Sequence, residues 1–473
     1  MRIHMMAVGG TGMGALAGLL KAQGHEVSGC DTALYPPMSD YLVCYGIKAA
    51  EGFDPAHLVP QPELVVIGNA VHKETPEALA CVENGVPYLS MAEAIRRFAI
   101  AERESLVVAG THGKTTTTAI CGYLMREAGL DPVMVVGGIA KNNDSSFLCG
   151  NGNWAVLEGD EYETAFFDKG PKFLHYVPSI LILNNIEMDH LDNFKDQRQL
   201  EQAFVRLFGV VREGGMIIAG TESEPVARLV QFAGRKVESF GLAGNEDWSA
   251  ARVCPSQEGT SFTLLRKGIE VAEFQSPLWG EHNLRNAIAA LAACITAGAN
   301  VEKLRSALPT FAGVKRRQEV VFRSGSVVVV DDFAHHPTAI AETLKALRQG
   351  FAAQKLVACF EPRSYTCQTS LHQERLASSF ALADAVLLGP FKPSAKIPQN
   401  ERLDLGRVVE ELAAAGKEAS QVQSYDECLE RVVAMAQPGT LVAFFSSGAY
   451  GSLPEKLADA LGQGSGWPLI TAR

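Results

Sequence analysis

A short stretch near residue 110 combines glycine, lysine and hydroxyl side chains at a spacing that suits phosphate binding. The apolar run 106–109 predicts a buried strand, and the residues after it are Gly110, Thr111, His112, Gly113, Lys114, Thr115 and Thr116. In such a loop the backbone N–H groups face an anion, the lysine reaches the terminal phosphates, and a hydroxyl holds Mg²⁺. We expect a helix from Ala119 onward. The alternative, a plain turn before a core helix, does not need a lysine followed by four threonines.

Polar residues also end two apolar runs, and this predicts a metal site beside the loop. Glu158 follows the strand-like run 154–157, and His190 closes a polar cluster after the run 179–183. The carboxyl ends of parallel strands meet at one edge of a sheet, so both residues are expected near the bound phosphates. Glu158 and Thr115 offer the oxygen ligands that Mg²⁺ prefers, whereas histidine is a less usual ligand. A surface or core histidine is the alternative for His190.

The N-terminal residues carry a glycine pattern typical of nucleotide-binding folds. Residues 1–8 predict a strand, residues 9–12 a glycine loop, residues 13–23 a helix, and Asp31 closes the next strand. This order begins a Rossmann-like unit, in which the acid meets a ribose hydroxyl. The pattern is imperfect because Ala7 fills its first glycine position. Alone, it fits either a dinucleotide oxidoreductase or glycines that only pack a helix closely on a sheet.

Two asparagines on one helical turn suggest recognition of a base. Asn283 and Asn286 precede the helical stretch 287–297 and are three residues apart, so both project from one turn. Amides placed in this way suit an adenine edge, and a helix cap at Asn283 is the alternative. The basic run 315–317 is either a solvated charge cluster or a phosphate clamp.

Length and composition describe an α/β protein of several domains. The 473 residues are 47% hydrophobic and 20% charged, which is ordinary for globular domains. We expect a Rossmann-like domain at residues 1–103 and a P-loop ATPase-like domain with a mostly parallel sheet at residues 104–312. A second Rossmann-like domain is expected at residues 313–473, where polar clusters again follow strand-like runs.

Charge and cysteine usage narrow the possible partners and the location. The net charge of −11 argues against broad nucleic-acid binding, and no apolar run approaches the length of a membrane span. The first residues do not resemble a signal peptide, and the ten cysteines contain no Cys-x-x-Cys pair. We therefore expect a cytoplasmic protein with reduced thiols that binds neither nucleic acid nor membrane.

The order of the motifs resembles one family over essentially the whole chain. GTHGKTTTT, EGDEYE, NNIEMDH, GEHNLRN, KRRQE and DDFAHHPT follow the order found in the Mur ligase family. The short loop, with Val108 where the usual form has its first glycine, is the version of that family. The resemblance implies an ATP- and Mg²⁺-dependent amide-bond ligase of peptidoglycan synthesis or recycling. Such an enzyme phosphorylates the carboxylate of UDP-N-acetylmuramate and transfers the acyl group to an amine.

The resemblance also implies roles for the matching residues. The reacting groups are expected to meet Lys114, His335 and Arg363, and Mg²⁺ is expected at Thr115, Glu158 and His190. ATP contacts are expected from the loop 110–116 and from Asn283, Asn286, Arg317 and Asp332. The UDP-sugar is expected at Gly10, Thr11, Gly12, Met13 and Asp31, and the incoming amine at Ser364.

The amine substrate separates two branches of this family. YPPMS at 35–39, FFDK at 166–169, KFLHY at 172–176 and EPRS at 361–364 resemble the branch that uses L-alanyl-γ-D-glutamyl-meso-diaminopimelate. Tyr365-Thr366 is closer to the branch that uses L-alanine, which stays the alternative. Outside the family, a nicotinamide-dependent oxidoreductase would leave residues 104–473 unexplained. A non-catalytic nucleotide sensor is the third hypothesis.

Overall fold

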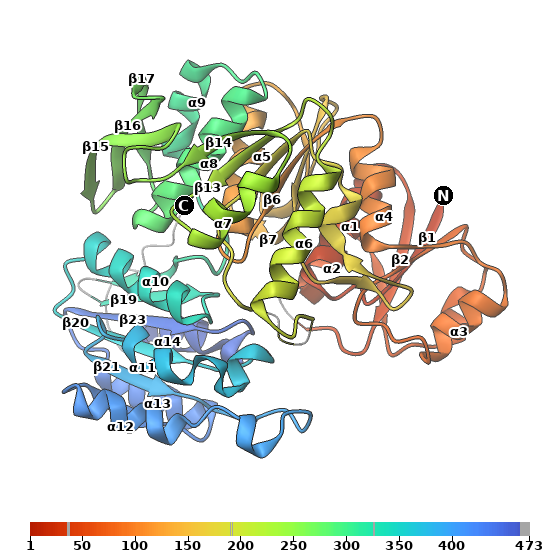
Figure 1. Ribbon diagram of the computed structural model, residues 1–473. Helices are drawn as coiled ribbons and strands as arrows, with labels where there is room; N and C mark the ends of the chain where they lie inside the picture. Colours follow the sequence, from red (N-terminus) through yellow and green to blue (C-terminus); the bar gives the residue numbers. More distant parts are fainter. Residues whose placement is uncertain (36–37, 190, 192, 325–326, 464–473) are drawn as a thin grey trace.

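Three main sheets, each with its own helices, build the α/β fold (Figure 1). The computed structural model describes residues 1–35, 38–189, 191, 193–324 and 327–463. The expected fold class is confirmed, with mostly parallel strands in each main sheet. Among the helices described, none is both long and apolar enough to cross a membrane.

The N-terminal sheet is parallel throughout and has the strand order β3-β2-β1-β4-β5. Its strands are β1 (Arg2–Met6), β2 (Glu26–Asp31), β3 (Lys48–Glu51), β4 (Leu64–Ile67) and β5 (Tyr88–Ser90). Its helices are α1 (Thr11–Ala22), α2 (Met38–Cys44), η1 (Pro55–Leu58), α3 (Pro76–Glu83), α4 (Met91–Ala94) and η2 (Ile95–Ile100). The strand order reverses between β1 and β4, where nucleotides bind in such sheets. The glycine loop after β1 lies at this point.

The central sheet has the order β17-β16-β15-β14-β13-β12-β6-β9-β7-β8. Its strands are β6 (Glu104–Ala109), β7 (Val133–Ala140), β8 (Ser145–Cys149), β9 (Trp154–Glu158), β12 (Ile180–Leu183), β13 (Met216–Gly220), β14 (Lys236–Phe240), β15 (Trp248–Ser256), β16 (Gly259–Arg266) and β17 (Ile269–Ser276). A separate hairpin pairs β10 (Glu163–Ala165) with β11 (Asp168–Pro171). The helices are α5 (Lys114–Glu127), η3 (Lys172–His175), α6 (Gln197–Val210), α7 (Glu224–Leu229), η4 (Val230–Phe232), α8 (Glu281–Thr296), α9 (Val301–Ala307) and η5 (Leu308–Thr310).

The C-terminal sheet has the order β18-β19-β23-β20-β21-β22, and only β18 pairs in the antiparallel sense within its described residues. The strands are β18 (Glu319–Ser324), β19 (Val327–Asp332), β20 (Lys355–Phe360), β21 (Ala385–Leu388), β22 (Glu418–Gln421) and β23 (Thr440–Phe445). The helices are α10 (Pro337–Gly350), η6 (Thr366–Gln368), η7 (Ser370–His372), α11 (Gln373–Ser379), η8 (Gln399–Glu401), α12 (Leu405–Ala414), α13 (Tyr425–Met435), η9 (Tyr450–Ser452) and α14 (Leu453–Gln463).

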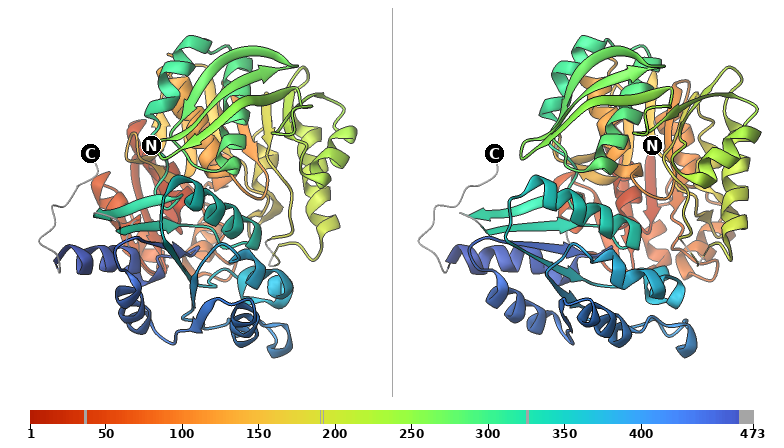
Figure 2. Two further views of the ribbon diagram at one scale, coloured as in Figure 1. Left: turned by 90° about the vertical axis from the view of Figure 1, so that its left-hand side faces the viewer. Right: turned by 60° about the vertical axis from the view of Figure 1, so that its left-hand side comes forward.

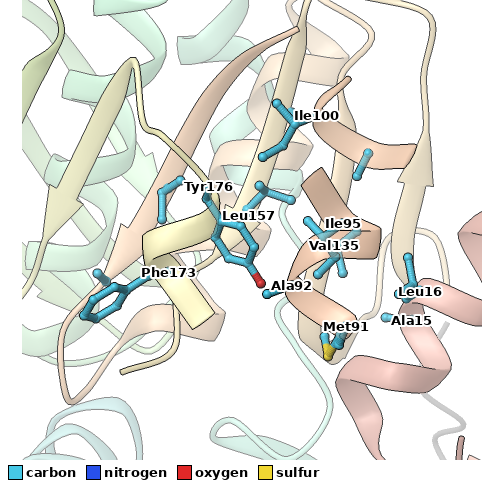
Figure 3. Packing of buried hydrophobic residues seen from close by; sticks show 14 of the residues in the cluster. Ala15, Leu16, Met91, Ala92, Ile95, Ile100, Val135, Leu157, Phe173 and Tyr176 are labelled. Carbon is cyan, nitrogen blue, oxygen red and sulfur yellow. The ribbon is translucent and has the colours of Figure 1, made fainter. Parts of the chain in front are cut away.

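An apolar interface joins the N-terminal helices to the central sheet (Figure 3). Met91 and Ile95 after β5 lie in one buried cluster with Val135 of β7 and Leu157 of β9. Helix α1 packs against the β7–β8 hairpin, and a Cβ on Gly18 would lie 2.5 Å from Phe147 Cε1. A side chain at Gly18 would therefore push the helix away from the hairpin. This packing fixes the N-terminal glycine loop relative to the phosphate loop.

The C-terminal sheet forms a separate layer beside the central one, as Figures 1 and 2 show. The connecting segment is fastened to the end of β7 by two backbone hydrogen bonds. Lys141 N donates to Gly313 O at 3.0 Å, and Lys315 N donates to Ile139 O at 2.9 Å. This attachment holds the basic run 315–317 close to the edge of the central sheet.

Ala7 adopts the backbone conformation that the missing glycine would favour. Its φ is +66°, in the left-handed region that costs a residue with a Cβ about 1–2 kcal/mol. The loop therefore keeps a glycine-like shape although the first glycine of the pattern is absent.

Replacing Ala7 with glycine should raise the free energy of unfolding by up to about 1 kcal/mol, because the relief of strain exceeds the added chain entropy. The control, Ala413→Gly on the exposed side of α12, should lower it by about 0.5–1 kcal/mol. Urea unfolding measures both values. If Ala7→Gly lowered the free energy of unfolding as much as the control does, the claim that the backbone at Ala7 is strained would be wrong.

Candidate active site between the three sheets

One cavity of about 740 Å³ is lined by residues from all three main sheets and their loops. Its wall includes most of the residues singled out from the sequence: Gly10, Thr11, Gly12, Met13, Asp31, Thr111, His112, Gly113, Lys114, Thr115, Thr116, Glu158, Asn283, Asn286, Arg317, Asp332 and His335. It lies at the carboxyl ends of the central parallel strands, where α/β sheets bind ligands. The structure thus brings together residues that lie up to 325 positions apart in the sequence, from Gly10 to His335.

The phosphate loop requires its two glycines. Gly110 has a φ of +126°, and a Cβ there would lie 2.8 Å from Asn185 O. Gly113 has a φ of +80°, and a Cβ there would lie 2.5 Å from Asn286 Oδ1. Helix α5 begins directly afterwards at Lys114, so the expected start at Ala119 is wrong. The left-handed Gly113 turns the chain into the helix early and leaves the N-terminal N–H groups of the helix facing the cavity.

The ammonium group of Lys114 is buried and held by an acid from the loop after β9. Lys114 Nζ donates to Glu161 Oε2 at 2.9 Å and to Gly110 O at 2.7 Å. Burial alone would lower the pKa of Lys114, but the carboxylates of Glu161, Asp160 and Glu158 outweigh it and raise that pKa. Lys114 therefore remains a cation at the cavity wall.

Thr115 and Glu158 form an oxygen-rich corner beside the loop. Thr115 Oγ1 donates to Glu158 Oε1 at 2.8 Å, and Gly137 N donates to Glu158 Oε2 at 2.6 Å. Burial and the neighbouring Asp160 raise the pKa of Glu158. Arg317 reaches the same corner from the C-terminal segment, where its Nη2 donates to Thr115 Oγ1 at 3.1 Å. The corner offers a hydroxyl and a carboxylate, the ligand types that suit Mg²⁺.

The loop after β12 supports the phosphate loop from the other side. His112 N donates to Asn185 Oδ1 at 2.8 Å, and Glu187 N donates to Thr111 Oγ1 at 2.9 Å. Burial alone would raise the pKa of Glu187, but His112, Thr338 and His336 hold it well below its usual range. Glu187 Oε2 accepts a hydrogen bond from Thr338 Oγ1 at 2.7 Å and so joins this loop to α10. His190, the expected metal ligand of this stretch, lies outside the described residues.

Asn283 and Asn286 project from the first turns of α8, as their spacing predicted. Both are buried, and Asn286 Nδ2 donates to Asn283 Oδ1 at 3.2 Å. The helix cap is Gly280, so the alternative of Asn283 as a capping residue is wrong. Asn283 Nδ2 also donates to Gln318 Oε1 at 3.2 Å. The two amides and Gln318 form a polar wall at this end of the cavity.

Asp332 fixes the C-terminal wall of the cavity. Its Oδ2 accepts from Gln318 N at 2.6 Å and its Oδ1 accepts from Ala334 N at 2.7 Å. Burial raises the pKa of Asp332. His335 follows in the same loop, with Nε2 3.8 Å from Asp189 Oδ2. These bonds orient the segment that carries Gln318 and His335.

Arg363 and Ser364 are not among the described residues that line this cavity. The Arg363 side chain is about half exposed, and its Nη1 lies 3.8 Å from Glu361 Oε1. Ser364 Oγ accepts a hydrogen bond from Cys367 N at 3.3 Å, within the turn after β20. Cys367 Sγ of the same turn donates to His335 O at 3.1 Å, so the turn adjoins the segment that carries His335.

Asp31 organises the N-terminal wall of the cavity. Its Oδ2 accepts from Gly9 N at 2.9 Å and its Oδ1 accepts from Thr32 N at 2.7 Å. The acid at the end of β2 thus holds the glycine loop at the switch point of the sheet, and its contact with a ribose hydroxyl stays a prediction.

Family models match the three parts of the chain in turn. They are described as the Mur ligase family catalytic domain (residues 2–103), the Mur ligase middle domain (108–294) and the Mur ligase glutamate ligase domain (316–448). The UDP-N-acetylmuramate–L-alanyl-γ-D-glutamyl-meso-2,6-diaminoheptandioate ligase of Escherichia coli strain K12 is 37% identical over 98% of each chain. This chain belongs to the Mur ligase family. The members of this family are ATP-dependent ligases that form amide bonds.

Two further comparisons place this Mur ligase among its relatives. The crystal structure of a murein peptide ligase from Psychrobacter arcticus 273-4 is 31% identical, covers 100% of both chains and has a TM-score of 0.74. The UDP-N-acetylmuramate–L-alanine ligase of Chlorobium chlorochromatii is 29% identical over 97% of this chain and 96% of its own.

Two functional candidates of this Mur ligase escaped the sequence argument. Glu161 stands in the acidic stretch 158–161, but nothing in the pattern showed which acid pairs with Lys114. Lys172 is buried at the cavity wall, with Nζ 3.6 Å from Asp160 Oδ2 and 4.1 Å from the centre of the Tyr162 ring. Burial lowers the pKa of Lys172. The motif KFLHY begins with Lys172, but lysines are mostly exposed, so the motif did not show that this one would be buried at the cavity.

Replacing Gly113 with alanine should weaken ATP binding at least about tenfold. The new Cβ would lie only 2.5 Å from Asn286 Oδ1 and would push the Asn286 side chain out of its place. The matched control is Gly416→Ala, where φ is +76° and nothing lies within 4 Å of the added Cβ. Both variants should lose about 1–2 kcal/mol of stability from the left-handed backbone. Calorimetric titration with ATP measures the affinity. Equal ATP affinity in Gly113→Ala and the control would contradict this account of the loop.

Proposed function

We propose that this Mur ligase joins L-alanyl-γ-D-glutamyl-meso-diaminopimelate to UDP-N-acetylmuramate and converts ATP to ADP and phosphate. One observation carries the choice of amine: relatives named for this tripeptide, from Escherichia coli and Haemophilus influenzae, are 37% and 34% identical over nearly their full length. Six L-alanine ligases among the sequence relatives are 29 to 31% identical. L-Alanine is the second candidate, and Tyr365-Thr366 favours it.

ATP fits the part of the cavity between the central and C-terminal sheets. The N–H groups of the loop 110–116 and the start of α5 suit its phosphates, with Lys114 and Arg317 supplying positive charge. The amides of Asn283 and Asn286 suit adenine, and the Asp332 carboxylate suits the ribose hydroxyls. Support for this placement comes from Gly113, where an added Cβ would press against Asn286, one of the two amides assigned to adenine.

Thr115 and Glu158 are the residues we assign to Mg²⁺, with His190 as a third candidate outside the described residues. The hydroxyl and carboxylate oxygens fit the preference of this ion. When bound, the ion neutralises charge on the transferring phosphoryl group.

The proposed reaction has two steps that share one phosphoryl group. In the first step, a carboxylate oxygen of UDP-N-acetylmuramate attacks the γ-phosphorus of ATP. The bond between the γ-phosphorus and the oxygen of the β-phosphate breaks, so that ADP departs and an acyl phosphate is formed. The amine then attacks the acyl carbon, and the tetrahedral intermediate expels phosphate and loses a proton. Lys114 neutralises charge during the first step, and positioning supplies most of the catalysis. We assign His335 to the second step, because it lines the cavity 3.8 Å from Asp189.

The remaining assignments concern the outer ends of the substrates. We assign the UDP-sugar to Gly10, Thr11, Gly12, Met13 and Asp31, which line the N-terminal wall of the cavity. We assign Arg363 and Ser364 to the incoming amine, because Cys367 of their turn donates to His335 O at 3.1 Å. The domains are proposed as residues 1–103, 104–312 and 313–473. A cytoplasmic location is proposed because all ten cysteines, which fall within the described residues, are free thiols.

The first test of this function compares amine substrates. Phosphate release should require UDP-N-acetylmuramate, and the tripeptide should give a kcat/KM at least about a hundredfold higher than L-alanine, a difference of about 2.7 kcal/mol. A coupled phosphate assay at matched amine concentrations measures both. A strong preference for L-alanine would overturn the choice of amine. ATP turnover at the same rate without the sugar nucleotide would overturn the ligase function.

A second test removes the buried charge of the phosphate loop. Lys114→Met combined with Glu161→Gln takes away both charges of the pair, so no buried ion is left without a partner. This double variant should fold with a wild-type circular dichroism spectrum and lose ligation by at least about a thousandfold, roughly 4 kcal/mol. The control Lys48→Ala, at an exposed position in β3, should keep full activity. Retained ligation in the folded double variant would refute the role of Lys114.

A further inference from the structure

A cluster of metal-ligating side chains lies in the N-terminal sheet, outside the cavity described above. It consists of His4, Cys30, His57 and Glu77, whose ligand atoms all lie within 4.8 Å of one another. None of these residues lines the cavity of the proposed active site, as far as the described residues show. The ligase function does not use them, so the cluster needs an explanation of its own.

The fold of the N-terminal sheet gathers these residues from four separate elements. His4 in β1 pairs in register with Ser28 in β2, and Cys30 follows two residues later on the same face of the sheet. His57 lies in η1 and Glu77 in the first turn of α3, two helices that pack together over this face. His4, Cys30 and Glu77 are buried, and only His57 is partly exposed.

The surroundings of the cluster are apolar. Cys30 belongs to a buried cluster formed with Met6, Ala7, Leu58, Val65, Ile67, Val71, Ala78, Cys81 and Val86. A carboxylate and two imidazoles in such a place are costly unless each polar atom has a partner. The hydrogen bonds of the cluster therefore have to be counted.

Hydrogen bonding among protein atoms leaves this cluster incompletely satisfied. His4 Nε2 and Glu77 Oε1 lie only 2.7 Å apart. Apart from this ion pair, neither buried atom has a hydrogen-bond partner among the described residues. His57 Nδ1 lies 3.2 Å from Glu77 Oε2 and also 3.4 Å from Asp54 N, which donates to it. The Nδ1 atom has a single lone pair, so His57 would give up the long contact with Asp54 N when that lone pair coordinates a cation next to Glu77.

The donor set identifies the kind of cation. Two imidazoles, one thiol and one carboxylate are ligands that favour Zn²⁺ over Mg²⁺ or Ca²⁺. Tetrahedral Zn²⁺ separates its ligand atoms by about 3.3–3.6 Å. Cys30 Sγ, which donates to Glu77 Oε2 at 3.1 Å, and His57 Nδ1, at 3.2 Å from the same oxygen, would move only slightly apart on binding the ion. His4 Nδ1 lies 2.9 Å from Ser28 Oγ, the kind of support that orients a metal-bound imidazole.

We propose that His4 Nε2, Cys30 Sγ, His57 Nδ1 and a Glu77 carboxylate oxygen bind one Zn²⁺ ion in a structural site. Four protein ligands close the coordination sphere, as in structural zinc sites. On binding, the Cys30 thiol gives its proton to solvent and the thiolate coordinates the ion. Cys30 precedes Asp31, whose carboxylate accepts from Gly9 N at 2.9 Å, so the ion would brace the strand end that carries this loop.

The test measures zinc binding by the full-length chain. The reduced protein is stripped with EDTA, desalted, loaded with ZnCl₂ in competition with a chromophoric chelator, and analysed for metal by mass spectrometry. Wild type should retain one more zinc ion than His57→Asn or Cys30→Ser. The matched controls His72→Asn and Cys44→Ser, at exposed positions of the same part of the chain, should bind like wild type. Equal zinc retention by all five proteins would overturn the proposal.

A spectroscopic measurement with Co²⁺ examines the ligands directly. The wild-type complex should show a thiolate-to-cobalt charge-transfer band in the near ultraviolet and intense tetrahedral bands in the visible. Cys30→Ser should lose the charge-transfer band, while Cys44→Ser should keep it. A wild-type complex without that band would refute Cys30 as a ligand. His57→Asn provides the same comparison if Cys30→Ser fails to fold, because His57 is the partly exposed member of the cluster.

Thermal unfolding separates this site from the ligase function. Zn²⁺ should raise the unfolding temperature of the wild-type chain and of Cys44→Ser without any nucleotide, and Mg²⁺ should not. The variants of the cluster should show no such rise. A rise of equal size in His57→Asn would contradict the site. Ligation activity does not enter this measurement, so the outcome is independent of the identity of the substrates.

Discussion

The arrangement of the active site depends on one buried positive charge, the ammonium group of Lys114. It lies 2.9 Å from Glu161 Oε2, and both side chains are almost completely buried. Removing one partner of such a pair typically costs about 3–5 kcal/mol, because the other charge is left in a poor solvent. The acids after β9 therefore belong to the phosphate loop as much as the glycines do. A bound triphosphate would offer the ammonium group further anions at the same wall.

The residues on either side of Lys114, Gly113 and Thr115, are closely packed or hydrogen-bonded to other parts of the chain. Gly113 stands against Asn286 from α8 and Asn184 from the loop after β12, with no space for a Cβ. Thr115 receives a hydrogen bond from Arg317, which arrives on the segment fastened to the end of β7. The apolar contacts of α1 and α4 fix the N-terminal sheet against the same strands. The cavity is thus shaped by packing, and its polar groups are oriented before any ligand binds.

Local patterns in the sequence predicted much of this site, because its chemistry starts in short segments. The loop 110–116 and the pair Asn283 and Asn286 each combine a motif with the start of a helix, and the structure places them at one cavity. The partner of Lys114 could not be predicted, since Glu161 is one of several acids that follow the same strand. The roles of Arg363 and Ser364 stay predictions, because neither is among the described residues that line the cavity. The cluster of His4, Cys30, His57 and Glu77 has no motif at all, because its members meet only when β1, β2, η1 and α3 pack together.

The central claim is that the phosphoryl group carried by this loop passes to a carboxylate before the amide bond forms. Isotope transfer tests it most directly. UDP-N-acetylmuramate labelled with ¹⁸O in its lactyl carboxylate is incubated with ATP, the tripeptide and the enzyme, and the released phosphate is analysed by mass spectrometry. The account predicts one ¹⁸O atom in inorganic phosphate for each amide bond formed, because the acyl carbon–oxygen bond breaks in the second step. Phosphate released without the label while the amide product accumulates would contradict it.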